Sequence, residues 1–287
     1  MVGEVERATA VARVGDHQVE FRLDRRGEDI VLVLLGGHCR AGLVLGEQVF
    51  VDADCGVLAV SRPGYGRTPL SAGPSVTEFT DVVRALCAQL GVDRLAAVVG
   101  ISGAGPTAVT LAARHPDLVE RLILQSAVGW VPWPDWRIRV GSYVGFNAWT
   151  EPVTWSLVRA LLRTAPEPGL RMLLRGLSTL PASEALATLS NEDRAALLAV
   201  CRRLRSGSGF LNDLRPTPDV CDEVTQPTLV IATRHDGGVP FTHAEALATA
   251  IRRAELVESG AASHFIWFSA DWPAIAERIT AFVTDAA

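Results

Sequence analysis

A short glycine-rich segment, Gly100-Ile101-Ser102-Gly103-Ala104-Gly105, lies between an apolar run at 95–99 and a helix-like run at 106–114. A sharp turn from a strand into a helix requires small flanking residues. It also holds the apex residue in a strained backbone with its side chain exposed. The apex residue here is Ser102, which such a turn would present as a nucleophile. Because a serine hydroxyl alone is a weak nucleophile, the chemistry also needs a base and an orienting carboxylate.

An acid and a histidine follow two later strand-like runs. Asp236 comes after the run 228–232, and His264 comes after the run 255–258. Residues directly after the carboxyl ends of parallel strands meet above one edge of an α/β sheet. We therefore expect Ser102, Asp236 and His264, in that chain order, to meet as nucleophile, acid and base for acyl transfer.

Each of these three residues also has a plainer interpretation. Ser102 fits a helix cap, Asp236 fits a turn before two glycines, and His264 fits a buried structural histidine. The strand end after 121–125 offers Gln125 and Ser126 but no carboxylate. Because all three residues follow strand ends in the required order, we favour the catalytic interpretation.

Strand-like and helix-like segments alternate along both ends of the chain. Nearly continuous apolar runs predict buried strands at 29–35, 56–60, 95–99, 121–125, 228–232 and 255–258. Helix-like segments alternate with them at 75–90, 106–114, 242–253 and 271–286, and a hairpin is predicted at 7–14 and 18–23. We predict an α/β fold with a mostly parallel sheet of about eight strands and helices on both faces.

The pattern changes between residues 128 and 218, where prolines separate several helix-like segments and no strand-like run appears. This stretch predicts an inserted helical cap, with residues 1–127 and 219–287 forming the α/β core.

Aromatic residues are concentrated at the start of the predicted cap, where five of the seven tryptophans lie between residues 130 and 155. One interpretation is a largely apolar pocket above Ser102, and the other is simply the core of the cap. The candidate pocket residues are His38, Trp130, Trp133, Tyr143 and Phe146.

The composition excludes several kinds of protein. All 27 basic residues are arginine, and without lysine there is no Schiff-base lysine or phosphate-binding P-loop lysine. A net charge of −5 gives no basic surface for nucleic acid or an anionic membrane. The six histidines form no metal-binding motif such as H-E-x-x-H, so no metal is expected.

The sequence also indicates a cellular compartment. The first residues lack the apolar stretch of a signal peptide, and no apolar run has the length of a membrane span. The five cysteines form no C-x-x-C pair, which fits free thiols in a reducing compartment. We expect a cytoplasmic protein.

These motifs together resemble the α/β-hydrolase fold superfamily with a helical cap. The similar segments are the loop Leu35-Gly36-Gly37-His38, the loop at 61–66, the Ser102 turn, and the loops of Asp236 and His264. The resemblance implies that Ser102 is the nucleophile, His264 the general base and then acid, and Asp236 its orienting acid. It also implies that the backbone N–H groups of Gly103 and Gly37 form the oxyanion hole.

We expect a serine hydrolase that acts through an acyl-enzyme on a carboxylic ester or thioester of a small apolar molecule. The same triad also supports C–C bond hydrolysis, lactone opening and perhydrolysis, and the fold does not choose among them. A ligand-binding protein and a non-hydrolytic tailoring enzyme remain alternatives. We expect no cofactor, and a monomer or homodimer whose partner is a small-molecule substrate.

Overall fold

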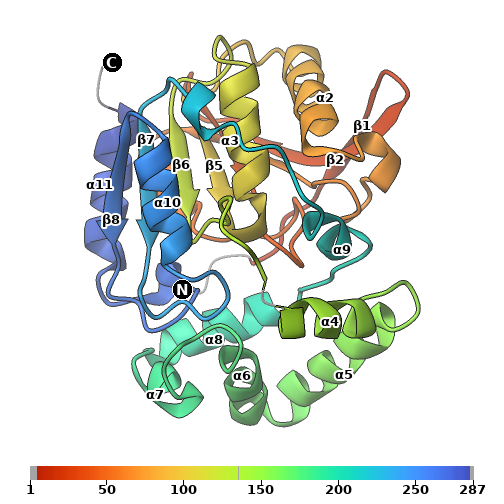
Figure 1. The fold of residues 1–287 in the computed structure, drawn as a ribbon, viewed down its shortest axis with the longest axis vertical. Helices are drawn as coiled ribbons and strands as arrows, with labels where there is room; N and C mark the ends of the chain where they lie inside the picture. The colour runs from red at the N-terminus through yellow and green to blue at the C-terminus, as the bar shows by residue number, and fades with distance from the viewer. Residues whose placement is uncertain (1–4, 135, 285–287) are drawn as a thin grey trace.

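Within residues 5–134 and 136–284, which the computed structural model describes, eight strands form one sheet in the order β1-β2-β4-β3-β5-β6-β7-β8 (Figure 1). β2 pairs in an antiparallel manner with β1 and β4, and the pairs from β4 through β3, β5, β6 and β7 to β8 are parallel. The strands are β1 Ala10–Val14, β2 His17–Asp24, β3 Ile30–Leu34, β4 Gly56–Val60, β5 Ala97–Ile101, β6 Leu122–Gln125, β7 Thr228–Ala232 and β8 Ala254–Glu258. The predicted fold class is confirmed.

The central strands are almost entirely apolar, as is expected where both faces of a sheet are covered. All five residues of β3 are buried. Since successive side chains of a strand point to opposite faces, Leu32 and Leu34 join one hydrophobic cluster, whereas Val31 and Val33 join another.

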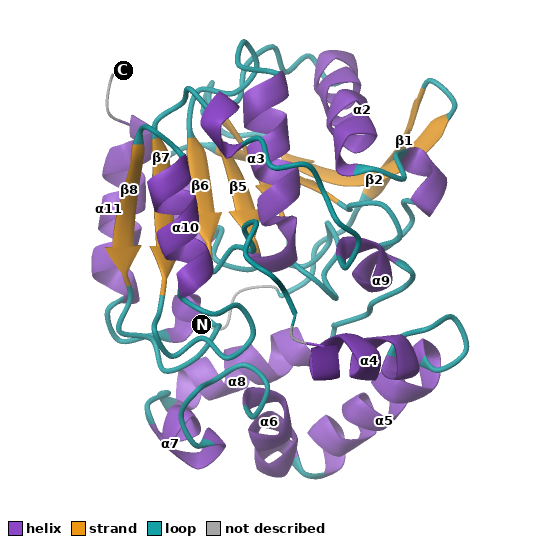
Figure 2. Ribbon diagram, viewed as in Figure 1, coloured by secondary structure: helices purple, strands orange, loops and turns teal. Residues whose placement is uncertain are grey.

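Helices cover each face of the sheet (Figure 2). On one face lie α2 Val76–Gln89, α3 Gly105–Arg114 and α10 Thr242–Ala250, and on the other lie α1 Gln48–Asp52 and α11 Trp272–Thr284. α2 begins with a capping box, in which the Ser75 side chain accepts from the Glu78 N–H and the Glu78 carboxylate accepts from the Ser75 N–H. α1 was not predicted, because five residues are too few to show helical periodicity.

Between β6 and β7 the chain forms six further helices within the described residues, all inside the predicted range 128–218. They lie beyond the carboxyl ends of the parallel strands (Figure 2). These helices are α4 Trp136–Gly145, α5 Glu151–Thr164, α6 Pro166–Leu174, α7 Ala182–Ala187, α8 Asn191–Cys201 and α9 Gly209–Asp213, and the 3₁₀ turns of the chain are η1 Leu70–Ala72, η2 Ser102–Ala104, η3 Cys221–Glu223 and η4 Ile266–Phe268.

The inserted helices share a hydrophobic cluster with one face of the sheet. Trp155 of α5 and Leu174 of α6 belong to the same cluster as Val31 of β3 and Ile123 of β6. The insertion is therefore packed firmly against the α/β layers. Its division from them at residues 128 and 218 stays a prediction.

None of the helices in the described part of the chain is both long enough and apolar enough to cross a membrane.

Candidate active site

Ser102 lies at the first position after β5, where the strand turns into η2 and α3. Its φ is +51°, a left-handed conformation that is strained for a residue with a side chain. The glycines around it permit close packing. A Cβ on Gly100 would lie 2.6 Å from the Cβ of Ala108, and one on Gly105 would lie 2.2 Å from the Val128 carbonyl oxygen. The small residues seen in the sequence therefore permit the sharp turn that presents the serine.

His264 and Asp236 form a buried pair. The Nδ1 atom of His264 lies 2.6 Å from Oδ2 of Asp236. The other carboxylate oxygen accepts hydrogen bonds of 2.7 Å from the N–H groups of Gly238 and Val239. Both oxygens of the carboxylate are thus hydrogen-bonded. This fixes the orientation of the imidazole and leaves its Nε2 atom available for proton transfer.

The serine and the histidine line one cavity of about 190 Å³. An apolar cavity of about 150 Å³ holds a benzene molecule, so this one has room for a small acyl or ring group. Most of the wall is apolar, and its larger apolar side chains are Leu45, Ile101, Trp133, Leu177, Val200, Leu204, Phe210, Val239, Phe265 and Trp267.

Gly37 and Gly103, the predicted oxyanion residues, lie next to each other on the cavity wall. A Cβ on Gly103 would be 3.6 Å from the backbone nitrogen of Gly37. A Cβ on Gly36 would be only 2.7 Å from the Cβ of Ser102, so only glycine allows this loop to approach the serine. The two backbone segments therefore lie beside Ser102, and their role as an oxyanion hole stays a prediction.

A buried ion pair beside the oxyanion loop was not predicted. The guanidinium of Arg62 binds both carboxylate oxygens of Asp213, and the hydroxyl of Tyr65 donates to Asp213 Oδ2 at 2.6 Å. Burial acts to lower the pKa of Arg62, but Asp213 opposes this and raises the pKa above its usual value. Arg62 and Asp213 are 151 residues apart, and no local pattern pairs them.

The loop between α6 and α7 was also missed as part of the site, although it contacts the loops that carry Asp236 and His264. Its Leu177 carbonyl accepts the His264 N–H at 2.8 Å, and its Thr179 N–H donates to the His235 carbonyl at 3.0 Å. Ser178 Oγ donates to the Ala262 carbonyl at 2.6 Å. The inserted segment therefore sets the position of the loops that carry Asp236 and His264.

Three of the predicted pocket residues lie at or beside the cavity. His38 and Trp133 line it, and the Trp133 indole donates to the Gly238 carbonyl at 2.7 Å. Phe146 lies behind His38, with ring centroids 4.9 Å apart.

The other two predicted pocket residues are corrected by the structure. The Trp130 indole donates to the Thr217 carbonyl at 3.0 Å, and its ring packs against the cluster beneath α2, α3 and α10. Tyr143 is 49% exposed on α4. Neither is among the residues that line the cavity, because Trp130 packs against that cluster and Tyr143 faces solvent.

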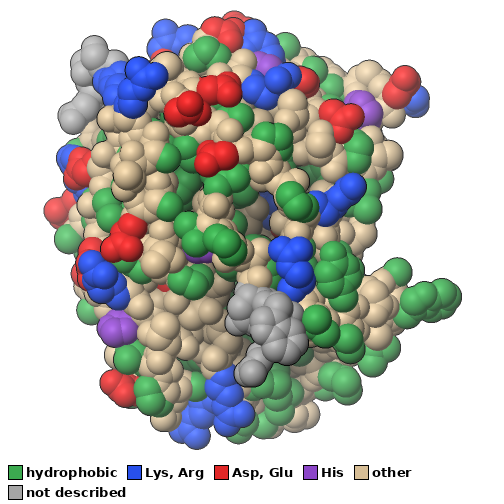
Figure 3. Space-filling view, in the orientation of Figure 1, with side chains coloured by type: hydrophobic (Ala, Val, Ile, Leu, Met, Phe, Trp, Pro, Cys, Tyr) green, Lys and Arg blue, Asp and Glu red, His purple; other side chains and the backbone are tan. Residues whose placement is uncertain are grey.

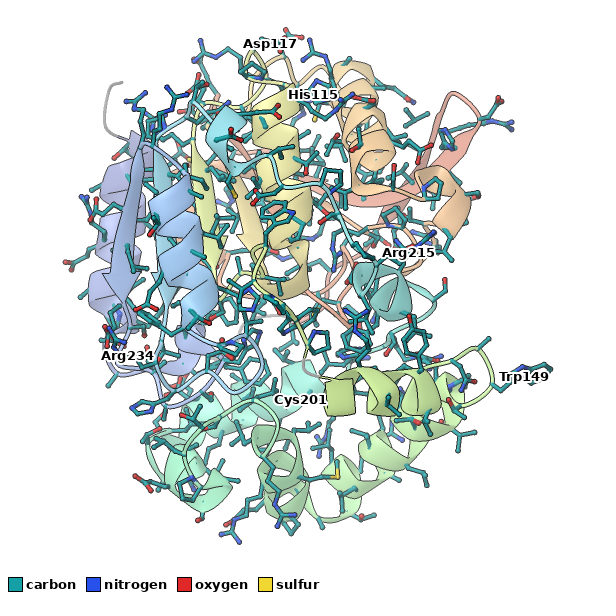
Figure 4. The ribbon with its side chains drawn as sticks, in the orientation of Figure 1. His115, Asp117, Trp149, Cys201, Arg215 and Arg234 are labelled. Atoms are coloured by element: carbon teal, nitrogen blue, oxygen red, sulfur yellow. The ribbon has the colours of Figure 1, made fainter. Side chains whose placement is uncertain are left out.

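The aromatic residues of the insertion thus divide among three environments. Trp155 is buried in the core, Trp133 lines the cavity, and Trp149 projects into solvent with 88% exposure (Figure 4). Hydrophobic side chains, drawn green in Figure 3, gather near the α4–α5 edge, and the exposed ones there are Val140, Tyr143, Val144, Trp149, Val153 and Leu157.

A thiol lies at the same cavity as the Ser102 hydroxyl. Cys39 also lines the wall, but burial raises the pKa of its thiol to about 12, so it stays protonated and unreactive. Across the described residues, no three His, Cys, Asp or Glu side chains are grouped so as to hold a metal ion.

Comparisons with known proteins agree with this architecture. Residues 44–271 match the family model described as alpha/beta hydrolase fold. An uncharacterized hydrolase, YcgS of Bacillus subtilis, is 30% identical over 255 residues, which are 87% of this chain and 89% of the relative. The pimeloyl-[acyl-carrier protein] methyl ester esterase of Aromatoleum aromaticum is 30% identical over 246 residues, or 78% of this chain and 88% of the relative. An alpha/beta hydrolase fold protein from Nakamurella multipartita superposes with a TM-score of 0.80 at 24% identity, covering 96% and 99% of the two chains.

Proposed function

The chain belongs to the alpha/beta hydrolase fold family, and on that premise we propose that it is a serine hydrolase. In this proposal it cleaves a carboxylic ester or thioester of a small apolar molecule through an acyl-enzyme. The observation that carries the proposal is that Ser102 and the His264–Asp236 pair meet at one apolar cavity. The name of the Aromatoleum relative, a methyl ester esterase, supports an ester as the scissile group.

In the proposed mechanism, acylation begins at Ser102. Ser102 Oγ attacks the carbonyl carbon of the ester while Nε2 of His264 takes the hydroxyl proton. The negative charge that develops on the carbonyl oxygen is stabilised by the backbone N–H groups of Gly37 and Gly103. As the tetrahedral intermediate collapses, the bond to the leaving oxygen or sulfur breaks and His264 returns the proton to that atom.

Deacylation repeats the sequence with water. His264 removes a proton from a water molecule, whose oxygen attacks the carbonyl carbon of the acyl-Ser102 ester. Collapse of the second intermediate releases the carboxylic acid and returns the proton to Ser102 Oγ. Asp236 holds the imidazole in the tautomer with Nδ1 protonated, and its charge stabilises the imidazolium formed in each half-reaction.

The size of the cavity sets the expected substrate range. With about 190 Å³ available, the site accommodates a short acyl chain or a single ring, and the apolar wall favours hydrocarbon over charged groups. In this proposal α4–α9 act as a cap that closes the cavity above the sheet.

Labelling with a fluorophosphonate probe, combined with assays of p-nitrophenyl esters from acetate to dodecanoate, tests the proposal. We expect wild-type labelling at Ser102 and an optimum at short acyl chains. We expect Ser102→Ala to abolish labelling and to lower kcat by at least about 10³-fold. The control is Ser71→Ala, which removes an exposed hydroxyl and should behave as wild type.

Two results would contradict ester hydrolysis by Ser102, and a third would contradict the proposed pocket. Equal labelling of wild type and Ser102→Ala would remove the serine from the chemistry. Labelling without ester turnover would instead favour the ligand-binding or tailoring alternatives on the same fold. An activity independent of chain length would argue against the small apolar pocket.

A further inference from the structure

His38 has an unusual backbone in the loop next to the oxyanion glycine. Its φ is +65°, a left-handed conformation that is uncommon for residues other than glycine. Its carbonyl accepts the Arg205 N–H at 2.8 Å, and its ring lies 4.1 Å from that of Phe210 and 5.2 Å from that of Trp155. Such strain persists only where the surroundings hold it, and it is concentrated at functional sites.

The protonation of the His38 ring follows from Ser206, its hydrogen-bond partner in the described part of the chain. Ser206 Oγ lies 2.7 Å from His38 Nδ1 and also 2.7 Å from Nε1 of Trp155. An indole N–H is only a donor, so Ser206 must accept from Trp155. The buried hydroxyl then needs an acceptor for its own hydrogen, and within the described residues that acceptor is His38 Nδ1. His38 is therefore unprotonated at Nδ1 and carries its hydrogen on Nε2.

The inserted helices hold Ser206 in this position. Its backbone N–H donates to Glu151 Oε1 at 2.9 Å, and the next N–H, of Gly207, donates to the same oxygen at 3.2 Å. Glu151 lies in the first turn of α5 and is buried. The Ser206 hydroxyl that fixes the His38 tautomer is thus part of a hydrogen-bond network that joins α5 to the loop of His38.

The Nε2–H group of His38 has no hydrogen-bond partner among the described residues. The Nε2 atom is not among the fully buried polar atoms that lack a partner, so it is accessible. His38 lines the same cavity as Ser102 and His264. A donor that faces this mostly apolar cavity is available for a hydrogen bond to a ligand. Because the ring packs against Phe210 of α9 and Trp155 of α5, His38 lies where the inserted helices adjoin the cavity wall.

The ring stays neutral in this setting. Burial lowers the pKa of His38 to about 3. The buried carboxylates of the elements packed against it already have cationic partners, Glu151 with Arg205 and Asp213 with Arg62. His38 therefore offers an uncharged donor, suited to a neutral oxygen.

We propose that His38 Nε2–H binds a second oxygen of the substrate, so that the site selects small acyl groups carrying a carbonyl or ether oxygen beyond the scissile carbonyl. This inference rests on the proposed function and narrows its substrate class. His38 would set specificity, whereas Ser206 would act as a positioning residue that fixes the tautomer.

A matched pair of substrates tests the inference: p-nitrophenyl pentanoate and p-nitrophenyl 4-oxopentanoate, which differ by one ketone. We expect the wild type to favour the ketone in kcat/KM by about fivefold to tenfold, the size of one hydrogen bond to a neutral acceptor. The ratio should fall to about one in His38→Phe, which keeps a ring without the donor, and recover partly in His38→Gln. The ratio is the readout because it cancels any general loss of activity.

The control for the ratio is Trp133→Phe, which alters another cavity residue whose N–H is committed to Gly238. Its ratio should match that of the wild type. A ketone preference that persists in His38→Phe, or no preference in the wild type, would overturn the inference while leaving ester hydrolysis intact.

A measurement without turnover separates failure of the inference from failure of the proposed function. In ¹⁵N-histidine-labelled Ser102→Ala protein, NMR should show His38 protonated at Nε2 from pH 5 to 8. Methyl 4-oxopentanoate should shift that signal, whereas methyl pentanoate should not. In Ser102→Ala/Ser206→Ala the fixed tautomer should be lost. An Nδ1–H tautomer, or no response to the ketone, would overturn the role of His38 even if no ester is hydrolysed.

Discussion

At the scale of single residues, Asp236 shows how hydrogen bonds to both oxygens can fix one side chain. One carboxylate oxygen faces His264 and the other accepts two backbone N–H groups, with the side chain fully buried. Both oxygens of the side chain at this position face hydrogen-bond donors, so each of them must be an acceptor. The orientation of the His264 ring thus depends on the charge and symmetry of this carboxylate.

We therefore expect Asp236→Asn to lower kcat by roughly 10³- to 10⁴-fold, the size of effect that loss of the orienting carboxylate has in serine proteases. The amide NH₂ of the asparagine must face either the Nδ1–H of the imidazole or the N–H groups of Gly238 and Val239. In either orientation one hydrogen-bond donor faces another. Steady-state hydrolysis of a p-nitrophenyl ester measures the effect, with a thermal melt to verify folding. A folded variant within tenfold of the wild-type kcat would show that Asp236 does not orient the base.

At the scale of elements, the inserted segment does more than cover the cavity. The α6–α7 loop is hydrogen-bonded to the loops that carry Asp236 and His264, and α9 is tied to the core through Asp213. α9 also carries Phe210, against which both His38 and Gly37 pack. The Arg62–Asp213 pair therefore connects the return of the insertion to the geometry of the oxyanion loop.

Asp213→Ala tests this connection. Removing one partner leaves the buried guanidinium of Arg62 uncompensated, so we expect the free energy of unfolding to fall by about 3 kcal/mol or more. Ester hydrolysis should weaken as well, because α9 loses its anchor. Urea denaturation gives the stability, and Asp222→Ala, which removes an exposed carboxylate, should change it by less than about 0.5 kcal/mol. Equal stability of the two variants would show that the pair is not what holds α9.

At the scale of the whole molecule, the burial of histidine side chains couples the stability of the fold to pH. Burial lowers the pKa of His38 to about 3, and it also lowers the pKa values of His115 and His243 below the usual range. An unfolded imidazole binds a proton near pH 6.5, whereas the folded His38 resists protonation until about pH 3. Between these values the unfolded state holds more protons, so stability is present above pH 6.5 and is lost as the pH falls.

We expect the free energy of unfolding of the wild type to fall from pH 7 to pH 4 more steeply than that of His38→Gln. The two slopes should differ by at most about 1.4 kcal/mol per pH unit, the limit for one proton. Urea denaturation at pH 7, 5.5 and 4.5 measures both slopes, and the other histidines cancel in the comparison. Parallel slopes would show that His38 is as easily protonated in the folded protein as in the unfolded chain.

Much of the architecture could be predicted because its causes are local. Buried parallel strands require continuous apolar runs, a strand-to-helix turn requires small residues, and α2 begins at a serine followed three residues later by a glutamate. The meeting of Ser102, Asp236 and His264 was predictable for a related reason, since the carboxyl ends of parallel strands lie along one edge of the sheet.

The lining of the cavity was decided only by tertiary structure. Aromatic residues that lie close together in sequence separate into cavity, core and solvent, as Trp133, Trp155 and Trp149 show, because the chain turns between them. The sequence by itself determined the sheet, the strand-to-helix turn and the order of the three catalytic candidates. Packing between distant segments determined the Arg62–Asp213 pair and the tautomer of His38, since contacts across more than a hundred residues leave no periodic or local signal.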